Sequence, residues 1–313
     1  MENLLFSING TLPIFIVMFI GIIVRRLKLV DDKYVSQANK LNFNTAMPVM
    51  LFENVRGSDI TTALDVKFTV MLMLMVIAEL VMAAGISCLC IKPYRRGSFT
   101  QGAFRGNTAL IGMALLINMY GESEIGAISV AVAVPVYNIG SVIALTLFPV
   151  EGEAKKKNAG DILLNIIKNP LIIGTVAGIA AAFFSIEFPA LIETSLDYLS
   201  DMAIGTALLC VGASMQFDKF RSRWKETVLA SALKLIIFPM IFIPVMALMG
   251  YRKDALMAAF IVLGSPTAVN SYVMARSMNH DEALASGIVV VSSLAGAVSM
   301  TVWVYVLKSM GLI

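Results

Sequence analysis

Two short polar stretches interrupt apolar runs of this chain, and their residue types suit the binding of an anion. The clearer one is Gly264–Asn270, inside an apolar run from Ala255 to Met278. Pro266 lacks a backbone N–H and clashes with the carbonyl one turn back, so it predicts a break in the helix. Ser265 and Pro266 also suit the N-cap and first residue of a new half-helix, whose free N–H groups and dipole attract an anion. The alternative is a packing kink without a ligand.

The second interrupted run lies earlier in the chain. Its first half would be Arg96–Arg105, which is too polar to face lipid and must face protein or water. Its second half begins at Asn107-Thr108, again a cap-forming pair before an apolar run. We expect the two breaks to cross and to supply positive potential without a formal charge. Their polar residues would either bind substrate or satisfy the carbonyls that the breaks free: Asn107, Thr108, Ser265, Pro266 and Asn270.

Tyr137 and Asn138 add polar groups near the middle of another apolar run, Ile125–Val150. They follow Pro135, which removes a hydrogen bond from the helix. A buried amide beside a proline either repairs the broken ladder or contacts a substrate. We expect both residues to contact substrate.

Glu79 and Lys234 are the two charges that lie deep in apolar runs. Ionisable groups inside a bilayer are costly and are usually paired or functional. Our hypothesis is that Glu79 titrates in proton coupling, with Lys234 as its partner or as an attractant for anions. The alternative is a static ion pair. Burial and a neighbouring lysine act on a carboxyl group in opposite directions, so the sequence leaves both roles open.

Composition indicates an integral membrane protein. Hydrophobic residues make up 58% of the 313, charged residues 14%, and the mean hydropathy is +0.83. The net charge of +3 does not indicate nucleic acid, because the basic residues lie in short loops. We expect no enzyme, metal or cofactor: HExxH, GxSxG and P-loop motifs are absent, the three cysteines lie in apolar runs, and His280 is the single histidine.

Ten apolar runs are near the length that a bilayer requires. A hydrophilic linker from Glu151 to Asn158 divides them into two sets of five. The predicted spans are Ile8–Val24, Ala38–Val55, Val66–Ile91, Phe104–Tyr120, Ile125–Val150, Ile162–Phe184, Thr194–Met215, Thr227–Gly250, Ala255–Met278 and Ala283–Leu307.

Loop charge and internal similarity predict how the halves are arranged. The loops on one side carry eighteen lysines and arginines and those on the other side five, which puts both termini outside the cytoplasm. Five spans in each half then insert the halves in opposite directions. A shift of about 157 residues aligns Pro13 with Pro170, and a shift of about 158 aligns Gly106 with Gly264. Weak similarity between oppositely inserted halves is typical of inverted-repeat transporters.

Several of these stretches resemble motifs of the auxin efflux carrier family. Phe104–Gly112 and Gly264–Ala275 look like that family's fourth- and ninth-span motifs. Weaker resemblances occur, in the family's order, at Asn42–Phe52, Asn169–Gly174 and Leu208–Ser214. The resemblance covers essentially the whole chain. The long central loop of the plant carriers is missing, which points to a bacterial member related to malate and malonate carriers and puts auxin itself in doubt.

The resemblance implies an all-α membrane protein with ten transmembrane helices in two inverted five-helix repeats, 1–150 and 162–313, joined by a cytoplasmic linker at 151–161. Helices 4 and 9 would be broken and would cross. Helices 1, 2, 6 and 7 would form a scaffold that often dimerises, and helices 3–5 and 8–10 a moving transport unit. We therefore expect a secondary transporter of a small organic anion in the bacterial cytoplasmic membrane. The alternatives are a cation/proton antiporter, which would usually need acidic residues at the crossing, and a non-transporting sensor.

Overall fold

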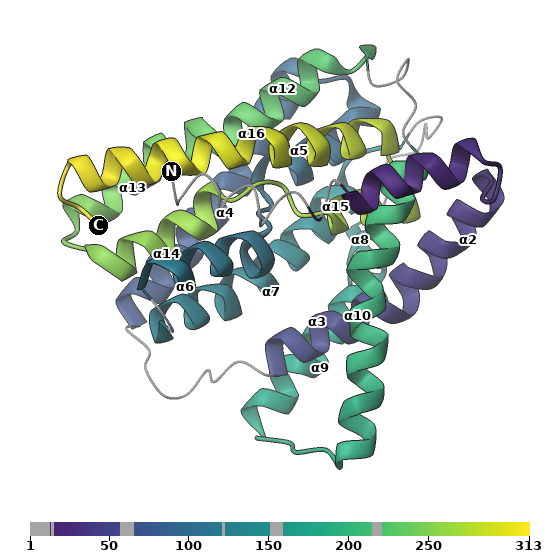
Figure 1. Ribbon diagram of the computed structural model, residues 1–313, viewed down its shortest axis with the longest axis horizontal. Coiled ribbons are helices and arrows are strands. Elements are labelled where there is room, and N and C mark those ends of the chain that lie inside the picture. The colour runs from purple at the N-terminus through teal and green to yellow at the C-terminus, as the bar shows by residue number, and fades with distance from the viewer. Residues whose placement is uncertain (1–12, 14–15, 57–65, 121–122, 151–158, 215–220) are drawn as a thin grey trace.

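The computed structural model describes residues 13, 16–56, 66–120, 123–150, 159–214 and 221–313 (Figure 1). Every regular element in these ranges is a helix, and residues 16–26 are also helical. The α-helices are α2 (Asp32–Leu41), α3 (Met47–Arg56), α4 (Val66–Cys90), α5 (Arg96–Phe104), α6 (Met113–Tyr120), α7 (Glu124–Leu147), α8 (Ala159–Ile167), α9 (Pro170–Phe183), α10 (Ala190–Ala213), α12 (Trp224–Ala232), α13 (Phe238–Leu248), α14 (Lys253–Gly264), α15 (Asn270–Ser277) and α16 (Glu282–Ser309). The shorter turns are the π-helical η1 (Asn42–Ala46), η3 (Thr108–Gly112) and η4 (Leu233–Ile237) and the 3₁₀-helical η2 (Pro93–Arg95).

Polar residues begin several of these helices, as helix capping predicts. The Asp31 side chain accepts a hydrogen bond from the Tyr34 N–H at the start of α2, at 2.7 Å. Asn169 caps α9 in the same way, with Pro170 as the first helical residue. Asp281 accepts from the Leu284 N–H and caps α16.

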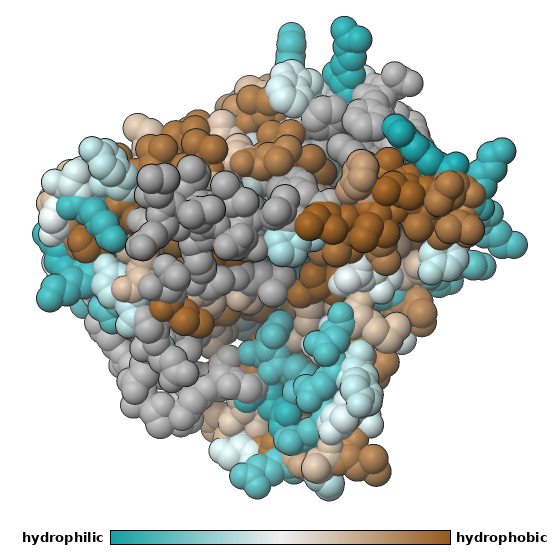
Figure 2. Space-filling model, in the orientation of Figure 1, coloured by the Kyte–Doolittle hydropathy of each residue, from teal (hydrophilic) through white to brown (hydrophobic). Residues whose placement is uncertain are grey.

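Five helical stretches in the described ranges are long and apolar enough to cross a membrane: Val66–Cys90, Ile128–Leu147, Ala190–Ala213, Trp224–Leu248 and Glu282–Ser309. Another apolar helix, Pro170–Phe183, is shorter. Large apolar side chains are exposed on many helices, and Figure 2 shows apolar surface over much of the face in view. Such a surface suits a lipid environment. Part of the predicted first span and the linker Glu151–Asn158 lie outside the described residues, so the ten-span count stays a prediction.

One set of helices, which we call the α10 group, comprises residues 16–26, α2, η1, α3, α9 and α10. Its helices approach closely at glycines. A Cβ on Gly174 or Gly178 of α9 would meet the backbone of Pro48 or Phe52 in α3, and a Cβ on Gly212 of α10 would meet the backbone of Met18. Small residues allow this close packing of helices in a membrane. In Figure 1, α3, α9 and the lower half of α10 project together below the other helices, and the upper half of α10 lies at the level of α15.

A second set of helices comprises α4–α7 and α12–α16, and we call it the α14 group, because α4, α6, α7 and α13 pack on α14. Every residue from Leu256 to Gly264 of α14 is buried. The Tyr137 hydroxyl of α7 donates to the Val262 carbonyl of α14 at 2.6 Å. The two groups meet where α15 packs on α2, η1 and α10 and where α7 packs on α3 and α9. The interrupted helices therefore lie in the core of one group and border the other.

Candidate functional site

The two predicted breaks meet in the structure. The first separates α5, which ends at Phe104, from η3, which begins at Thr108. The second separates α14, which ends at Gly264, from α15, which begins at Asn270. An isolated antiparallel bridge pairs Gly106 with Thr267.

Hydrogen bonds on each side of this bridge satisfy backbone groups that the breaks release. The Asn107 N–H donates to the Pro266 carbonyl at 2.6 Å, and the Ala268 N–H donates to the Arg105 carbonyl at 3.3 Å. The Thr267 hydroxyl donates to the Gly102 carbonyl at 2.7 Å, and its N–H donates to the Ser292 hydroxyl at 3.1 Å. The structure can therefore hold two irregular backbones in its core.

The predicted start of the second half-helix is wrong. Ser265 is the C-cap of α14 in an extended conformation, and the next helix begins only at Asn270, after Val269. The cause is the bridge, which requires an extended segment where a helix would otherwise begin. The first break follows the prediction more closely, since η3 begins at Thr108 after Asn107. Asn107 makes no side-chain capping hydrogen bond there.

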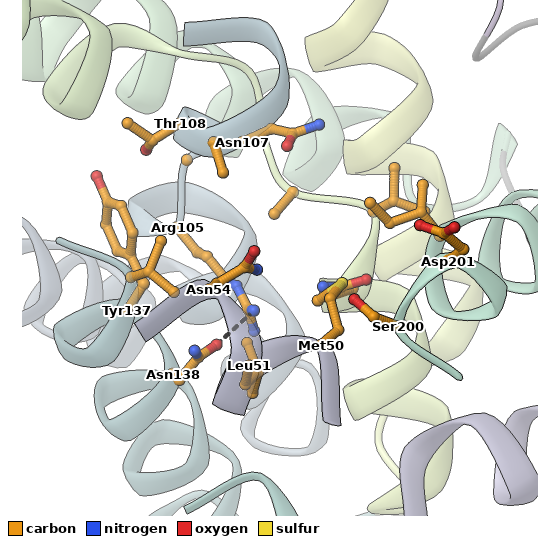
Figure 3. Close-up of a pocket in the computed structure, with 17 residues that line it drawn as sticks. Met50, Leu51, Asn54, Arg105, Asn107, Thr108, Tyr137, Asn138, Ser200 and Asp201 are labelled. Carbon is orange, nitrogen blue, oxygen red and sulfur yellow. Dashed lines mark hydrogen bonds between the residues drawn. The ribbon is translucent and has the colours of Figure 1, made fainter. Parts of the chain in front are cut away.

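A cavity of about 300 Å³ lies between the crossing and the α10 group. Its wall combines residues of the crossing with α3, α7 and α10, and Figure 3 shows them around the open space. Five of the seven predicted substrate residues come together here: Asn107, Thr108, Tyr137, Asn138 and Asn270. Ser265 and Pro266 do not line this cavity.

Ser265 and Pro266 lie behind the bridge instead. The Ser265 hydroxyl is next to Gly106, where an added Cβ would meet it. The Pro266 ring lies against Gly296 of α16, where an added Cβ would meet the ring carbons. Their positions fit a role in packing the crossing.

Arg105 is a wall residue that was not among the predicted substrate residues. It follows the last residue of α5, is only 4% exposed and lines the cavity. Its Nη2 donates to Asn138 Oδ1 at 2.6 Å, the bond drawn in Figure 3, and its Nη1 contacts the Met274 sulfur. No ion pair joins Arg105 to a carboxylate in the described part of the chain. The expectation of a crossing without a formal charge is therefore wrong.

Asp201 is a second wall residue that was not predicted from the sequence. It lies near the middle of α10, on the far side of the cavity from Arg105 and Asn138 in Figure 3. Its neighbours in the wall include Ser200 and Met50. Glu193, Asp197 and Asp201 recur every four residues, a spacing that puts them on one face of the helix. This spacing is the signal in the sequence that one face of the helix is acidic.

Glu79 and Lys234 form an ion pair of 3.0 Å, and both side chains are fully buried. Lys234, in the π turn η4, also donates to the Val262 carbonyl at 3.2 Å and to the Tyr137 hydroxyl at 3.3 Å. Glu79 Oε1 has no hydrogen-bond partner among the described atoms. Because Tyr137 lines the cavity, this ion pair is one side chain away from it.

One end of the boundary between the two groups is closed by polar contacts. The hydroxyls of Ser214, at the C-cap of α10, and Tyr272, on α15, are in hydrogen-bond contact. Arg276 donates to Ser214 at 3.2 Å and to Tyr272 at 3.0 Å, and it pairs with Glu282 at 2.6 Å. These contacts hold α15 against α10.

The described residues contain no group of three His, Cys, Asp or Glu side chains that could hold a metal ion. The polar wall of the cavity consists mainly of amides, hydroxyls, one guanidinium and one carboxylate. Such a wall suits a small polar organic molecule.

Comparisons with known proteins identify the family. A family model described as "Membrane transport protein" matches residues 6–304. The "Putative malonate transporter" of Rhizobium meliloti is 24% identical over 311 residues, covering 95% of each chain. The "Uncharacterized transporter YfdV" of Escherichia coli is 24% identical, covering 97% of this chain and 98% of that one.

Two further similarities are more limited. "Auxin efflux carrier component 1" of Arabidopsis thaliana is 26% identical over 131 residues, which is 40% of this chain and 21% of that protein. The solved structure of a sodium proton antiporter from Methanocaldococcus jannaschii superposes with a TM-score of 0.60 at 13% identity, covering 95% of this chain and 97% of that one. The second similarity shows a shared fold. The family model shows that this chain belongs to the membrane transport protein family, the family of the auxin efflux carriers.

Proposed function

We propose that this protein is a secondary transporter that moves a small organic anion by alternating access. The observation that carries the proposal is Arg105, a buried guanidinium in the cavity wall without a described carboxylate partner. A buried charge is costly unless it is paired. A substrate carboxylate would supply the missing partner, and the planar guanidinium suits two-point contact with it.

The amides of the wall support the same substrate. Asn138 Oδ1 accepts from Arg105, which leaves the Asn138 Nδ2 donor without a partner among the described atoms. That donor and the guanidinium could share one carboxylate. The cavity volume of about 300 Å³ is at the small end of ligand sites, which favours a small mono- or dicarboxylate over a larger ligand.

The proposed movement is of elevator type. Residues 1–150 and 162–313 would be inverted repeats with ten transmembrane helices. The α10 group, with the first, second, sixth and seventh spans, would be the static scaffold and would form a homodimer. The α14 group would carry the cavity across the bacterial cytoplasmic membrane, with both termini outside the cytoplasm. The cavity between the groups and the Ser214–Tyr272 contact at one end of their boundary support this division.

We further propose that Glu79 and Lys234 couple transport to protons. Their ion pair reaches the cavity wall through the Tyr137 hydroxyl, so a bound anion and the charge of the pair can influence each other. The test is uptake into proteoliposomes with and without an imposed pH gradient. Glu79→Gln should remove the response to the gradient, and an unchanged response would exclude this role.

The second candidate is a cation/proton antiporter, which the shared antiporter fold and Asp201 in the cavity wall favour. A thermal-shift screen of the purified protein separates the two candidates. Mono- and dicarboxylates, added as choline salts, should stabilise the protein, and Arg105→Gln should abolish the effect. Stabilisation by sodium chloride, with no response to any carboxylate, would contradict the anion proposal and favour the antiporter.

A further inference from the structure

The cavity has donors on one wall and an acceptor on the opposite wall. Arg105 and Asn138 lie together on one side, and Asp201 and Ser200 lie across from them (Figure 3). The guanidinium has donors only, and the free Asn138 Nδ2 is a donor because Oδ1 is engaged by Arg105. An ionised carboxylate such as Asp201 can only accept. A ligand that satisfies both walls therefore needs an acceptor facing Arg105 and Asn138 and a donor facing Asp201.

Asp201 has no described partner that would neutralise it. No ion pair or hydrogen bond joins it to another residue in the ranges that the structure describes. Glu193, two turns away on the same helix, differs in this respect, since Arg56 pairs with it at 3.2 Å. An acid near the middle of a candidate membrane span is costly unless it faces water or a ligand. The cavity provides that contact for Asp201.

A second unpartnered acceptor lies in the same wall. Asn270 Oδ1 is buried and has no hydrogen-bond partner among the described atoms, and Asn270 lines the cavity. A ligand that is only an anion would pair with Arg105 but would offer no donor to the buried Asn270 Oδ1 or to Asp201, whose side chain is exposed. A second negative charge on the ligand would meet Asp201 with repulsion.

We propose that the substrate is a carboxylate that also carries a hydrogen-donating group, namely a hydroxyl or an ammonium group. Its carboxylate would bind Arg105 and the Asn138 amide, and its donor would face Asp201. This inference rests on the proposed function, whose carboxylate it specifies as that of a small hydroxy acid, which is an anion, or of a small amino acid, which is a zwitterion. Asp201 is then the residue that selects them over simple carboxylates and over dianions.

The test compares four three-carbon acids binding to the purified full-length protein at neutral pH. Propionate has no donor, lactate has a hydroxyl, alanine has an ammonium, and malonate has a second carboxylate. Lactate or alanine should bind at least about tenfold more tightly than propionate, because the site's acceptors are otherwise left unpaired. Malonate should bind more weakly than the preferred acid.

Two isosteric variants on the same helix complete the test. Asp201→Leu has nearly the same shape but no acceptor, so it should remove the preference for the donor-bearing acid and should strengthen malonate binding. Asp197→Leu, one turn away and outside the cavity wall, should leave both unchanged. Equal binding of all four acids, or a preference that survives in Asp201→Leu, would overturn this inference while leaving an anion carrier. Binding of none of the four acids to a folded protein would overturn the anion proposal as well.

Discussion

Gly106 and Thr267 face each other in an antiparallel bridge at the point where two broken helices cross. The hydrogen bonds beside this pair run in both directions, from Asn107 to Pro266 and from Ala268 to Arg105. The bridge therefore fixes the backbone of Arg105 and of Asn107 at the cavity wall. Two segments about 160 residues apart in the chain form one rigid support for the site.

Gly106→Ala should disrupt this support. A Cβ at Gly106 would meet the Ser265 hydroxyl, the Val262 carbonyl at 3.1 Å and Lys234 Cε at 3.3 Å. Overpacking of this kind costs about 1–3 kcal/mol, and we expect a lower unfolding temperature and loss of carboxylate binding. Adding Ser265→Ala removes the nearest obstacle and should restore part of both. The control is Gly85→Ala, where a Cβ meets nothing within 4 Å. Normal binding by Gly106→Ala would contradict the role given to the bridge.

Local signals made the two breaks predictable from the sequence. Proline and cap-forming residues inside apolar runs favour an interruption, as Pro266 and Asn107 do here, although Pro135 lies inside the continuous helix α7. The pairing of Glu79 with Lys234 could also be predicted, because isolated charges in apolar helices require partners. The end of the second break could not be predicted, because the extended stretch up to Asn270 depends on pairing with a distant segment.

The two charged wall residues were not recognised from the sequence for a different reason. Arg105 lies among several basic residues near a helix end, and only the tertiary structure buries it. Asp201 occurs on a helix with other acids, and its spacing does not reveal that a cavity lies against this face. Ser265 and Pro266 were predicted to contact substrate but pack against Gly106 and Gly296 instead. Polar and cap-forming residues at a break can therefore serve packing as well as ligand binding.

Removing one charge of the buried Glu79–Lys234 pair should lower the free energy of unfolding much more than removing both charges. Glu79→Met or Lys234→Met alone leaves one uncompensated buried charge, which costs about 3–5 kcal/mol. The double variant removes both charges and should recover most of that stability in detergent unfolding experiments. Asp32→Asn, which removes a 2.8 Å pair with Arg25 on a more exposed surface, should change stability by less than about 1 kcal/mol. Additive losses in the double variant would show that the two charges do not depend on each other.

Opening at the Ser214–Tyr272 contact should expose Cys210, one turn earlier on α10. Cys210 is buried, while Cys88 and Cys90 are exposed and would be replaced by alanine. Tyr272→Phe removes the hydroxyl that contacts Ser214 and Arg276, and it should speed labelling of Cys210 by a water-soluble maleimide about fivefold. Tyr198→Phe, an exposed tyrosine on the same helix, is the control. An equal labelling rate in all three proteins would argue against separation of α15 from α10.

The role of Arg105 should be visible in a graded series of variants. Arg105→Gln removes the charge and Arg105→Lys keeps it without the planar fork, so affinity should fall at least about 30-fold in the first and less in the second. Arg96→Gln is the matched control, because Arg96 donates only to the Ile91 and Cys88 carbonyls among the contacts described. Isothermal titration with the tightest-binding carboxylate from the thermal-shift screen measures the affinities of the wild type and the three variants.

The most direct test of an anion carrier with Arg105 at its centre is counterflow in proteoliposomes. Vesicles loaded with unlabelled lactate, alanine, malonate or malate are diluted into a trace of the same labelled compound. At least one compound should accumulate transiently with the wild-type protein and should not accumulate with Arg105→Gln, at equal amounts of folded protein. Accumulation that persists in Arg105→Gln, or sodium exchange without exchange of any carboxylate, would contradict the account.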